Sequence, residues 1–253
     1  PARVSYTFNQ ATNTFTDLRA QMNSYDYANS FNQALKNDAY ISGANYTPRY
    51  SQADLDKYKS GEDPIFFPSV NWYDVMLKKT SAQQQHNLSV NGGTDKVRYA
   101  ISTGYFNQEG LFNNTNLSPG YDANIRFKRF NFRSNLNFNI SKRFKAALDV
   151  SSQNEFRTGN ALNTQTVIDN IARANPTVSP GIVDGKLIQL STAGGNPLGS
   201  LYQAGYQREF RNFLNGSFRL DYDLEDFVKG LSTHAIVSYQ NFNSQRFLNS
   251  KPT

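Results

Sequence analysis

The sequence contains no cysteine, a single tryptophan, two methionines and two histidines among its 253 residues. Without cysteine the chain can form neither disulfides nor thiolate metal sites. No apolar stretch approaches the ~18 residues that a membrane-spanning helix needs. This excludes helical membrane spans, but it does not exclude membrane-spanning strands, which alternate in character and are polar on average.

The start of the chain lacks an initiator methionine, a basic n-region and an apolar h-region. We therefore expect the segment to come from the middle of a longer chain. There is no long run of like charges and no nucleic-acid recognition motif, so no nucleic-acid partner is expected. The formal net charge of +6 indicates an ordinary solvated surface of mixed charge.

Residues that could carry chemistry are scarce. The sequence has no nucleophile elbow, P-loop or dinucleotide fingerprint. We therefore do not expect the protein to be an enzyme, and we expect no catalytic residue and no cofactor. His86 and His234 fall on separate expected strands, and the sequence offers no further ligands that would complete a metal site with them. The carboxylates near 221–226 are interpreted as a solvated turn rather than a metal site or acid/base pair.

Aromatic residues are abundant although the chain is polar. Phe, Tyr and Trp make up 14% of the sequence, whereas the mean hydropathy is −0.63. Disordered chains are also polar, but they lack aromatic residues because they build no core. The combination favours many half-buried strands.

The clearest pattern lies at 129–140, where apolar and polar residues alternate over about twelve positions. Phe130, Phe132, Leu136 and Phe138 share one face, and we predict that they face lipid. The opposite face carries Arg129, Arg133 and four asparagines. A strand of this length exceeds the usual ~5–6 residues of soluble proteins and is long enough to cross a tilted barrel wall.

The same alternation recurs along the chain and predicts about seven antiparallel strands. The other expected strands are 2–9, 84–91, 96–105, 144–153, 213–224 and 231–240. Their polar faces add further residues that we expect to line a wet lumen. The lumen-facing candidates are Arg98, Arg129, Arg133, Lys145 and Arg219.

The expected connections alternate between long and short. Long segments at 10–83, 107–127 and 157–208 alternate with turns at 91–95, 141–142 and 223–230. All the long loops would therefore leave one end of the sheet, as the extracellular loops of outer-membrane barrels do. Within these loops, helices are expected at 23–38, with Tyr27, Phe31 and Leu35 on one face, at 52–59 after an N-cap at Ser51, and at 164–174. In the last segment Val167, Ile168, Ile171 and Ala172 recur at helical spacing, and we interpret both stripes as packing surfaces of folded loops rather than binding helices.

These observations predict an all-β fold that is part of a transmembrane antiparallel β-barrel. A β-sandwich or a lipocalin-like barrel also alternates, but it lacks the strand length and the one-sided loops. Seven strands cannot close a membrane barrel, and an open edge cannot face lipid, because unpaired amides in hydrocarbon are costly. More chain is expected to complete the wall.

Several segments, in a consistent order, resemble the SusC/RagA family of TonB-dependent outer-membrane transporters. HNLSVNGGTDKVRYAISTGYFNQEGLF at 86–112 is the most specific match, and RFNFRSNLNFNISKRFKAALDVS follows it at 129–151. The flanking matches are ARVSYTF at 2–8, PIFFPSVNWYD at 64–74, ANPTVSPGIVDGK at 174–186 and NPLGSL at 196–201.

The resemblance implies a barrel of about 22 strands with a plug in its lumen. Residues 1–253 would then be the N-terminal portion of the barrel domain, without the plug and the remaining strands. It also implies a multi-pass protein of the bacterial outer membrane that contacts membrane lipid and works with a SusD-like surface lipoprotein. Energy would come from the TonB complex, through regions outside this segment.

The sequence leaves three functions open. The first is TonB-dependent import of a glycan or peptide, meaning an oligosaccharide or oligopeptide. The second is a passive porin or adhesin barrel, which needs neither plug nor TonB. The third is a soluble β-rich binding module.

Overall fold

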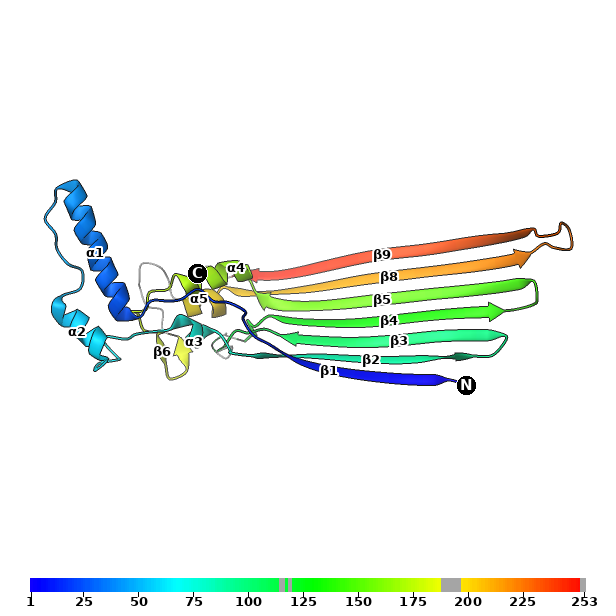
Figure 1. Cartoon of the computed structure of the whole chain (residues 1–253), viewed down its shortest axis with the longest axis horizontal. Coiled ribbons are helices and arrows are strands. Elements are labelled where there is room, and N and C mark those ends of the chain that lie inside the picture. Colours follow the sequence, from blue (N-terminus) through cyan, green and yellow to red (C-terminus); the bar gives the residue numbers. More distant parts are fainter. Residues whose placement is uncertain (114–116, 118–119, 188–196, 251–253) are drawn as a thin grey trace.

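A computed structural model describes residues 1–113, 117, 120–187 and 197–250, and it is dominated by one antiparallel sheet (Figure 1). Its seven strands pair in the order β1-β2-β3-β4-β5-β8-β9, so every strand lies beside its neighbour in sequence among the strands of this sheet. The bounds are β1 Arg3–Asn13, β2 Ser81–Gly93, β3 Val97–Glu109, β4 Arg126–Asn139, β5 Phe144–Asn160, β8 Gly205–Asp223 and β9 Ser232–Ser250.

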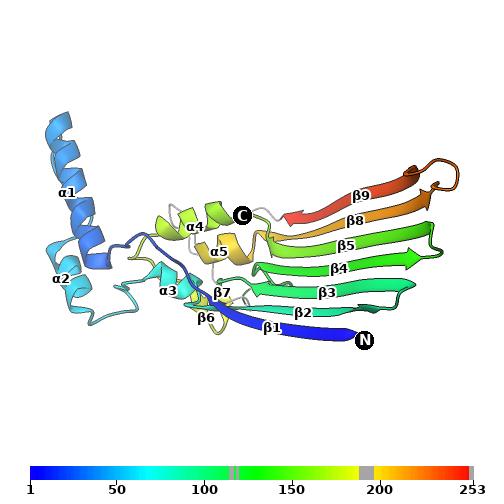
Figure 2. The same ribbon diagram turned by 45° about the vertical axis from the view of Figure 1, so that its right-hand side comes forward.

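The long connections all leave the same end of the sheet, which confirms the expected one-sided arrangement. The helices gather at this loop end, while the hairpins β2–β3, β4–β5 and β8–β9 turn at the opposite, turn end (Figures 1 and 2). The sheet is not closed, because β1 and β9 form its two edges. Parts of the expected loops, residues 114–116, 118–119 and 188–196, lie outside the described residues.

The strands and the first hairpin differ in extent from the sequence-based expectation. The strands run further toward the loop end than predicted, most of all to Asn160 on β5, from Gly205 on β8 and to Ser250 on β9. The first hairpin does not turn at its two glycines, because Gly92 and Gly93 still pair with β3 and the turn follows at 94–96. Gly93 has φ +153°, and a Cβ there would lie 2.3 Å from the Val97 carbonyl oxygen, so only glycine fits.

The densest core lies in the loops rather than beneath the sheet. It joins α3 (Trp72–Met76), α4 (Thr164–Ala172) and α5 (Pro197–Tyr202) at the loop end. Trp72 is 1% exposed, and its indole Nε1 donates to the Asn175 carbonyl over 2.9 Å. Val167 and Ile171 of α4 are fully packed here, which confirms that the apolar stripe at 164–174 serves packing. A small hairpin, β6 (Ile182–Val183) with β7 (Lys186–Leu187), completes the loop end.

Two helices project beyond this core as an arm, α1 (Ser24–Ser42) and α2 (Gln52–Ser60) (Figure 2). Ser51 caps α2 as expected, in a reciprocal capping box with Asp54. On α1 the most buried residues are Ser24, Ala28 and Asn32, whereas Phe31 of the expected aromatic stripe is 40% exposed. Among the described residues, none of the helices is both long and apolar enough to cross a membrane.

Candidate functional site: the polar face of the sheet

The register of the strands gives the sheet two chemically different faces. Phe130, Phe132, Leu136 and Phe138 share a face with Tyr105, Thr103, Tyr99 and Val97 of β3, to which they pair. Continuing the pairing across all strands gives one apolar face. Its members include Val4, Tyr6, Phe8, Leu88, Val90, Ile101, Ala146, Leu148, Val150, Leu214, Phe218, Leu220, Ala235, Val237 and Tyr239.

Many apolar side chains of this face are exposed in the described part of the chain. Val237 is 71% exposed, Val4 is 68% exposed and Phe132 is 43% exposed. Exposed apolar side chains on all seven strands would be very unfavourable in water, because exposed apolar patches of soluble monomers rarely exceed a few hundred Å².

The five lumen candidates all lie on the opposite, polar face. Arg98 pairs with Asn137, Arg133 pairs with Ser151, and Lys145 pairs with Asp221, so the register brings these side chains to one surface. Arg129 and Arg219 lie on the same surface. The medium that each face meets stays a prediction.

Cations outnumber anions on the polar face. Its cationic members are Arg3, Arg98, Arg129, Arg133, Lys145, Arg157, Arg211, Arg219 and Arg246, and its acidic members are Asp149, Glu155, Glu209, Asp221 and Asp223. Many of the remaining positions are Asn, Gln or Ser, such as Asn135, whose side-chain amide donates to Asp149. The face is therefore polar and carries an excess of positive charge.

A group of charged residues near the loop end was missed by sequence reasoning. Glu155 and Glu209 alternate with arginines in two neighbouring rows, since Glu155 pairs across the strands with Arg129 and Arg211, and Glu209 with Arg157 and Arg246. The expected strands end at 153 and 240 and begin at 213, and the expected loop covers 157–208. Arg157 therefore falls in the expected loop, and Glu155, Glu209, Arg211 and Arg246 fall outside every expected strand. Their polar neighbours on both faces leave no alternation that could have revealed them.

The contacts within this charged group are specific. Glu155 is only 8% exposed; it accepts from Gln153 Nε2 over 2.9 Å and lies 3.6 Å from Arg157 Nη2. Arg211 Nη2 lies 2.7 Å from Glu209 Oε1. Arg246 Nη2 donates to the Gln207 amide oxygen over 2.7 Å, so its charge faces a neutral partner. A cavity of about 310 Å³ adjoins Arg157, Arg211 and Arg246.

Arg129 is held differently from the other arginines. Its guanidinium carbon lies 5.5 Å from the Phe106 ring centroid, a cation–π distance. Its Nε is buried and has no hydrogen-bond partner in the described part of the chain. Arg157 stacks in the same way over Phe127 at 5.0 Å. These two rings fix the arginine side chains against the wall.

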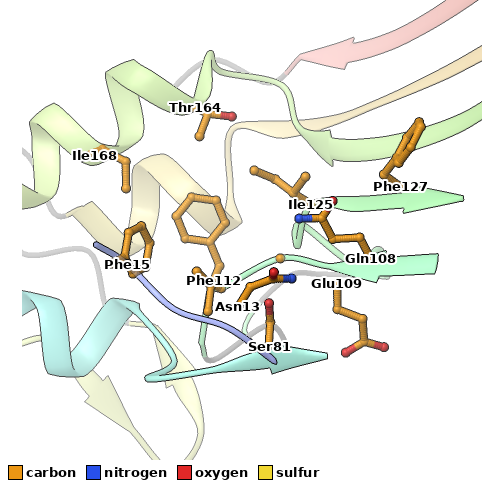
Figure 3. A pocket seen from close by; sticks show the side chains of 12 residues that line it. Asn13, Phe15, Ser81, Gln108, Glu109, Phe112, Ile125, Phe127, Thr164 and Ile168 are labelled. Carbon is orange, nitrogen blue, oxygen red and sulfur yellow. The ribbon is translucent and has the colours of Figure 1, made fainter. Parts of the chain in front are cut away.

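A second cavity of about 270 Å³ lies where the strands meet the loop core (Figure 3). Figure 3 shows Phe15, Phe112, Ile125 and Ile168 gathered around this space. At its edge, Asn13 pairs with Ser81, and Asn13 Nδ2 and Ser81 Oγ are both buried without a hydrogen-bond partner among the described residues. The cavity thus combines an apolar wall with an amide donor and a hydroxyl, which suits a ligand that carries both kinds of group.

The histidines and the turn carboxylates do not assemble a reactive site. His86 lies on the apolar face of β2, where its Nδ1 is 2.8 Å from the Tyr6 hydroxyl, whereas His234 lies on the polar face of β9. Asp226 forms an ion pair with Arg143 and stabilises the turn end. Within the described ranges no group of three His, Cys, Asp or Glu residues could hold a metal ion. In the loop core, burial raises the pKa of the Tyr202 hydroxyl well above its usual range, so it stays protonated.

Long antiparallel strands, neighbour-to-neighbour pairing and one apolar face define the wall of a transmembrane β-barrel that is not closed by this chain. Comparison with known proteins identifies the kind of barrel. No family model matches the chain. TonB-dependent receptor P26 of Formosa agariphila is 23% identical over 189 residues, which are 75% of this chain and 18% of that protein. TonB-dependent receptor SusC of Bacteroides thetaiotaomicron is 26% identical over 147 residues, which are 58% of this chain and 14% of SusC.

Solved structures agree with these relatives. The RagAB peptide importer in its closed-closed state superposes with a TM-score of 0.66 at 15% identity, and the alignment covers 97% of this chain and 28% of that chain. The open-open state gives a TM-score of 0.65 at 14% identity with the same coverage. The chain is thus SusC/RagA-like and resembles part of a TonB-dependent transporter. It spans less than a fifth of the length of the curated relatives it matches.

Proposed function

We propose that this chain is part of a transporter for the TonB-dependent import of oligosaccharides or oligopeptides across the bacterial outer membrane. The observation that carries the proposal is the two-faced sheet, with an exposed apolar face on one side and a polar, positively charged face on the other. The named relatives are receptors or transporters, and none of those reported above is an enzyme.

In this proposal the apolar face meets lipid and the polar face lines the lumen. Phe130, Phe132, Leu136 and Phe138 then contact hydrocarbon, while the five arginine and lysine candidates face water. The edges of β1 and β9 need pairing partners, because unpaired backbone amides in hydrocarbon cost several kcal/mol each. Residues 1–253 are accordingly the N-terminal portion of a barrel domain whose other strands and plug are supplied by further chain.

A SusD-like surface lipoprotein is the proposed partner at the loop end. The loops here hold a dry core and a projecting arm, and large ordered loops usually exist to bind something. The arm exposes apolar side chains, with Tyr40 89% exposed and Ile41 82% exposed at the end of α1. Such residues suit a protein partner, because aromatic and aliphatic side chains are the anchors of interfaces.

Purification and uptake of the full-length protein test the proposal together. Isolation in mild detergent should recover the barrel with a surface lipoprotein, and deletion of TonB should abolish growth on the transported nutrient. A barrel with Tyr40→Ser and Ile41→Ser should lose part of the lipoprotein, whereas Lys142→Gln at the turn end should not. Repeated recovery of a bare barrel, with uptake unaffected by loss of TonB, would favour a passive porin instead.

A further inference from the structure

A cationic cavity lies on the side of the sheet where cations are least expected. Its volume is about 390 Å³, and Tyr121, Arg126, Lys128, Phe156, Tyr206 and Arg208 contribute to its lining. The register places Arg126 opposite Thr158, and Thr158 opposite Arg208, in one row of the apolar face. Lys128 and Phe156 form the next row toward the turn end. These basic residues therefore share a face with Phe130 and Phe132.

The height of the cavity follows from two aromatic rows on the same face. Phe144 contacts Tyr222 near the turn end, with ring centroids 6.1 Å apart, and Phe156 contacts Phe210 near the loop end at 4.9 Å. Phe144 and Phe156 are twelve residues apart on β5. At a rise of ~3.3 Å per residue and a tilt of ~40°, this interval covers ~30 Å, the thickness of a bilayer core. The two rows match the aromatic girdles of membrane barrels.

Lys128, Phe156, Arg126 and Arg208 thus lie at the loop-end girdle, at the level of lipid headgroups. Toward the turn end the same face carries Phe130, Phe132 and Leu214, with Asn154 and Asn212 paired to each other in the row next to Phe156. Toward the loop end the strands lead into the loops. A cation at this level can reach the headgroups while its aliphatic stem covers apolar surface.

The charges in the cavity do not balance internally. Arg126 forms an ion pair with Asp122 at 2.9 Å, but Lys128 and Arg208 have no acidic partner among the described residues. Arg208 lies over the Tyr206 ring, 4.9 Å from its centroid. Two positive charges at a low-dielectric boundary call for an external anion.

The cavity wall is also fixed in place. The Tyr121 hydroxyl donates to the Tyr202 carbonyl over 2.6 Å and accepts from the Gly205 amide over 3.0 Å. The rings of Tyr121 and Tyr206 lie 5.1 Å apart. The loop core therefore anchors one side of the cavity, and the strands form the other.

We propose that this cavity binds the phosphorylated headgroup of a lipid in the outer leaflet of the membrane. Lys128 and Arg208 would donate charge-assisted hydrogen bonds to phosphate oxygens, which arginine matches bidentately. Phe156 and Tyr206 would pack against the adjoining sugar and acyl groups. The inference rests on the proposed membrane placement of the sheet, and it adds a lipid site that is separate from the transport path on the polar face.

The test uses the full-length protein in neutral-detergent micelles with fluorescent diphosphorylated lipid A as the probe. The double variant Lys128→Gln/Arg208→Gln should weaken binding of this probe at least tenfold, because each basic residue near a lipid surface contributes roughly a fivefold factor. Lys142→Gln/Lys229→Gln removes the same charge at the exposed turn end and should leave binding unchanged. Lys128→Arg/Arg208→Lys keeps both charges and should retain binding, which separates lost charge from misfolding.

Two further arms distinguish the source of the anion. Dephosphorylated lipid A should bind weakly to both the wild type and the double variant. Excess inorganic phosphate should compete poorly, because it lacks the glycolipid groups that contact Phe156 and Tyr206. Equal binding of diphosphorylated lipid A to the wild type and the double variant would overturn the proposal, as would full displacement by inorganic phosphate. A chain recovered in the soluble fraction would instead overturn the proposed membrane function.

Discussion

Substitution of Leu136 by arginine tests which face of the sheet meets lipid. Leu136 pairs with Leu148, which lies four residues from the turn-end girdle at Phe144 and eight from the loop-end girdle at Phe156. Val150 lies midway between the two girdles on β5, two residues from Leu148. At a rise of ~3.3 Å per residue and a tilt of ~40°, Leu148 and its partner Leu136 lie about 5 Å from the bilayer midplane along the membrane normal. Arginine on the lipid face costs ~2–4 kcal/mol at the midplane and less toward the interfaces, so we expect about 2–3 kcal/mol.

The matched control is the neighbouring residue on the other face. Asn135→Arg introduces the same charge one position away, next to Asp149, which its side chain already contacts. We expect a change within about 0.5 kcal/mol, as for a surface substitution. Val150→Arg, nearest to the midplane, should cost at least as much as Leu136→Arg.

The assay is guanidinium-induced unfolding of the full-length protein in phosphatidylcholine vesicles, compared by midpoint. The order of destabilisation should be Val150→Arg, then Leu136→Arg, then Asn135→Arg. If Asn135→Arg were the most damaging, the faces would be inverted. If all three were equally mild, neither face would lie in hydrocarbon, and the membrane placement would fail.

Three further predictions concern the loop end and the topology. A cysteine at Ser60 should react with an impermeant maleimide on intact cells that lack the lipoprotein partner, whereas one at Thr94 in the turn end should not; the opposite labelling would reverse the topology. Trp72→Ala should destabilise the loop core by about 3–5 kcal/mol, detected as faster hydrogen exchange in α3 and α4 but not in β4; unchanged exchange would refute its anchoring role. Hydrogen bonds from Ser51 lower the pKa of Asp54. The capping box therefore contributes its full stability above the ordinary aspartate pKa, and this contribution is lost as the pH falls through the lowered pKa of Asp54. Hydrogen exchange at the start of α2 should accelerate in acid, and Asp54→Asn should remove that pH dependence.

The sequence predicted the parts of the fold in which apolar and polar residues alternate along a strand. This alternation is what a strand needs when one of its faces contacts lipid and the other contacts water. The alternation at 129–140 sets the register of β4, and every strand that alternates in this way was found. Alternation fails beyond Phe156 on β5, where residues such as Arg157 and Thr158 are polar on both faces. A strand wetted on both sides has no period-2 signal, so the last residues of β5 and the first of β8 were assigned to a loop.

The same reason explains what was missed in the candidate site. Arg98, Arg129, Arg133, Lys145 and Arg219 lie on alternating segments and could be placed on one face from the sequence. Glu155, Arg211 and Arg246 lie on strand ends, and their grouping depends on pairings between strands that are far apart in sequence. The short helices α3 and α5 were also missed, because five or six residues are too few to show helical periodicity.

In the proposed membrane placement, the strands that continue past the loop-end girdle raise the loops away from the membrane. β5 extends four residues beyond Phe156, to Asn160. At ~3.3 Å per residue and a tilt of ~40°, this places the rim of the wall ~10 Å above the headgroup level. The core around Trp72 is therefore carried by a collar of strand ends, formed by the residues beyond Phe156, and has no contact with lipid. A protein approaching from outside the cell would meet this collar first and could settle on it without displacing any membrane.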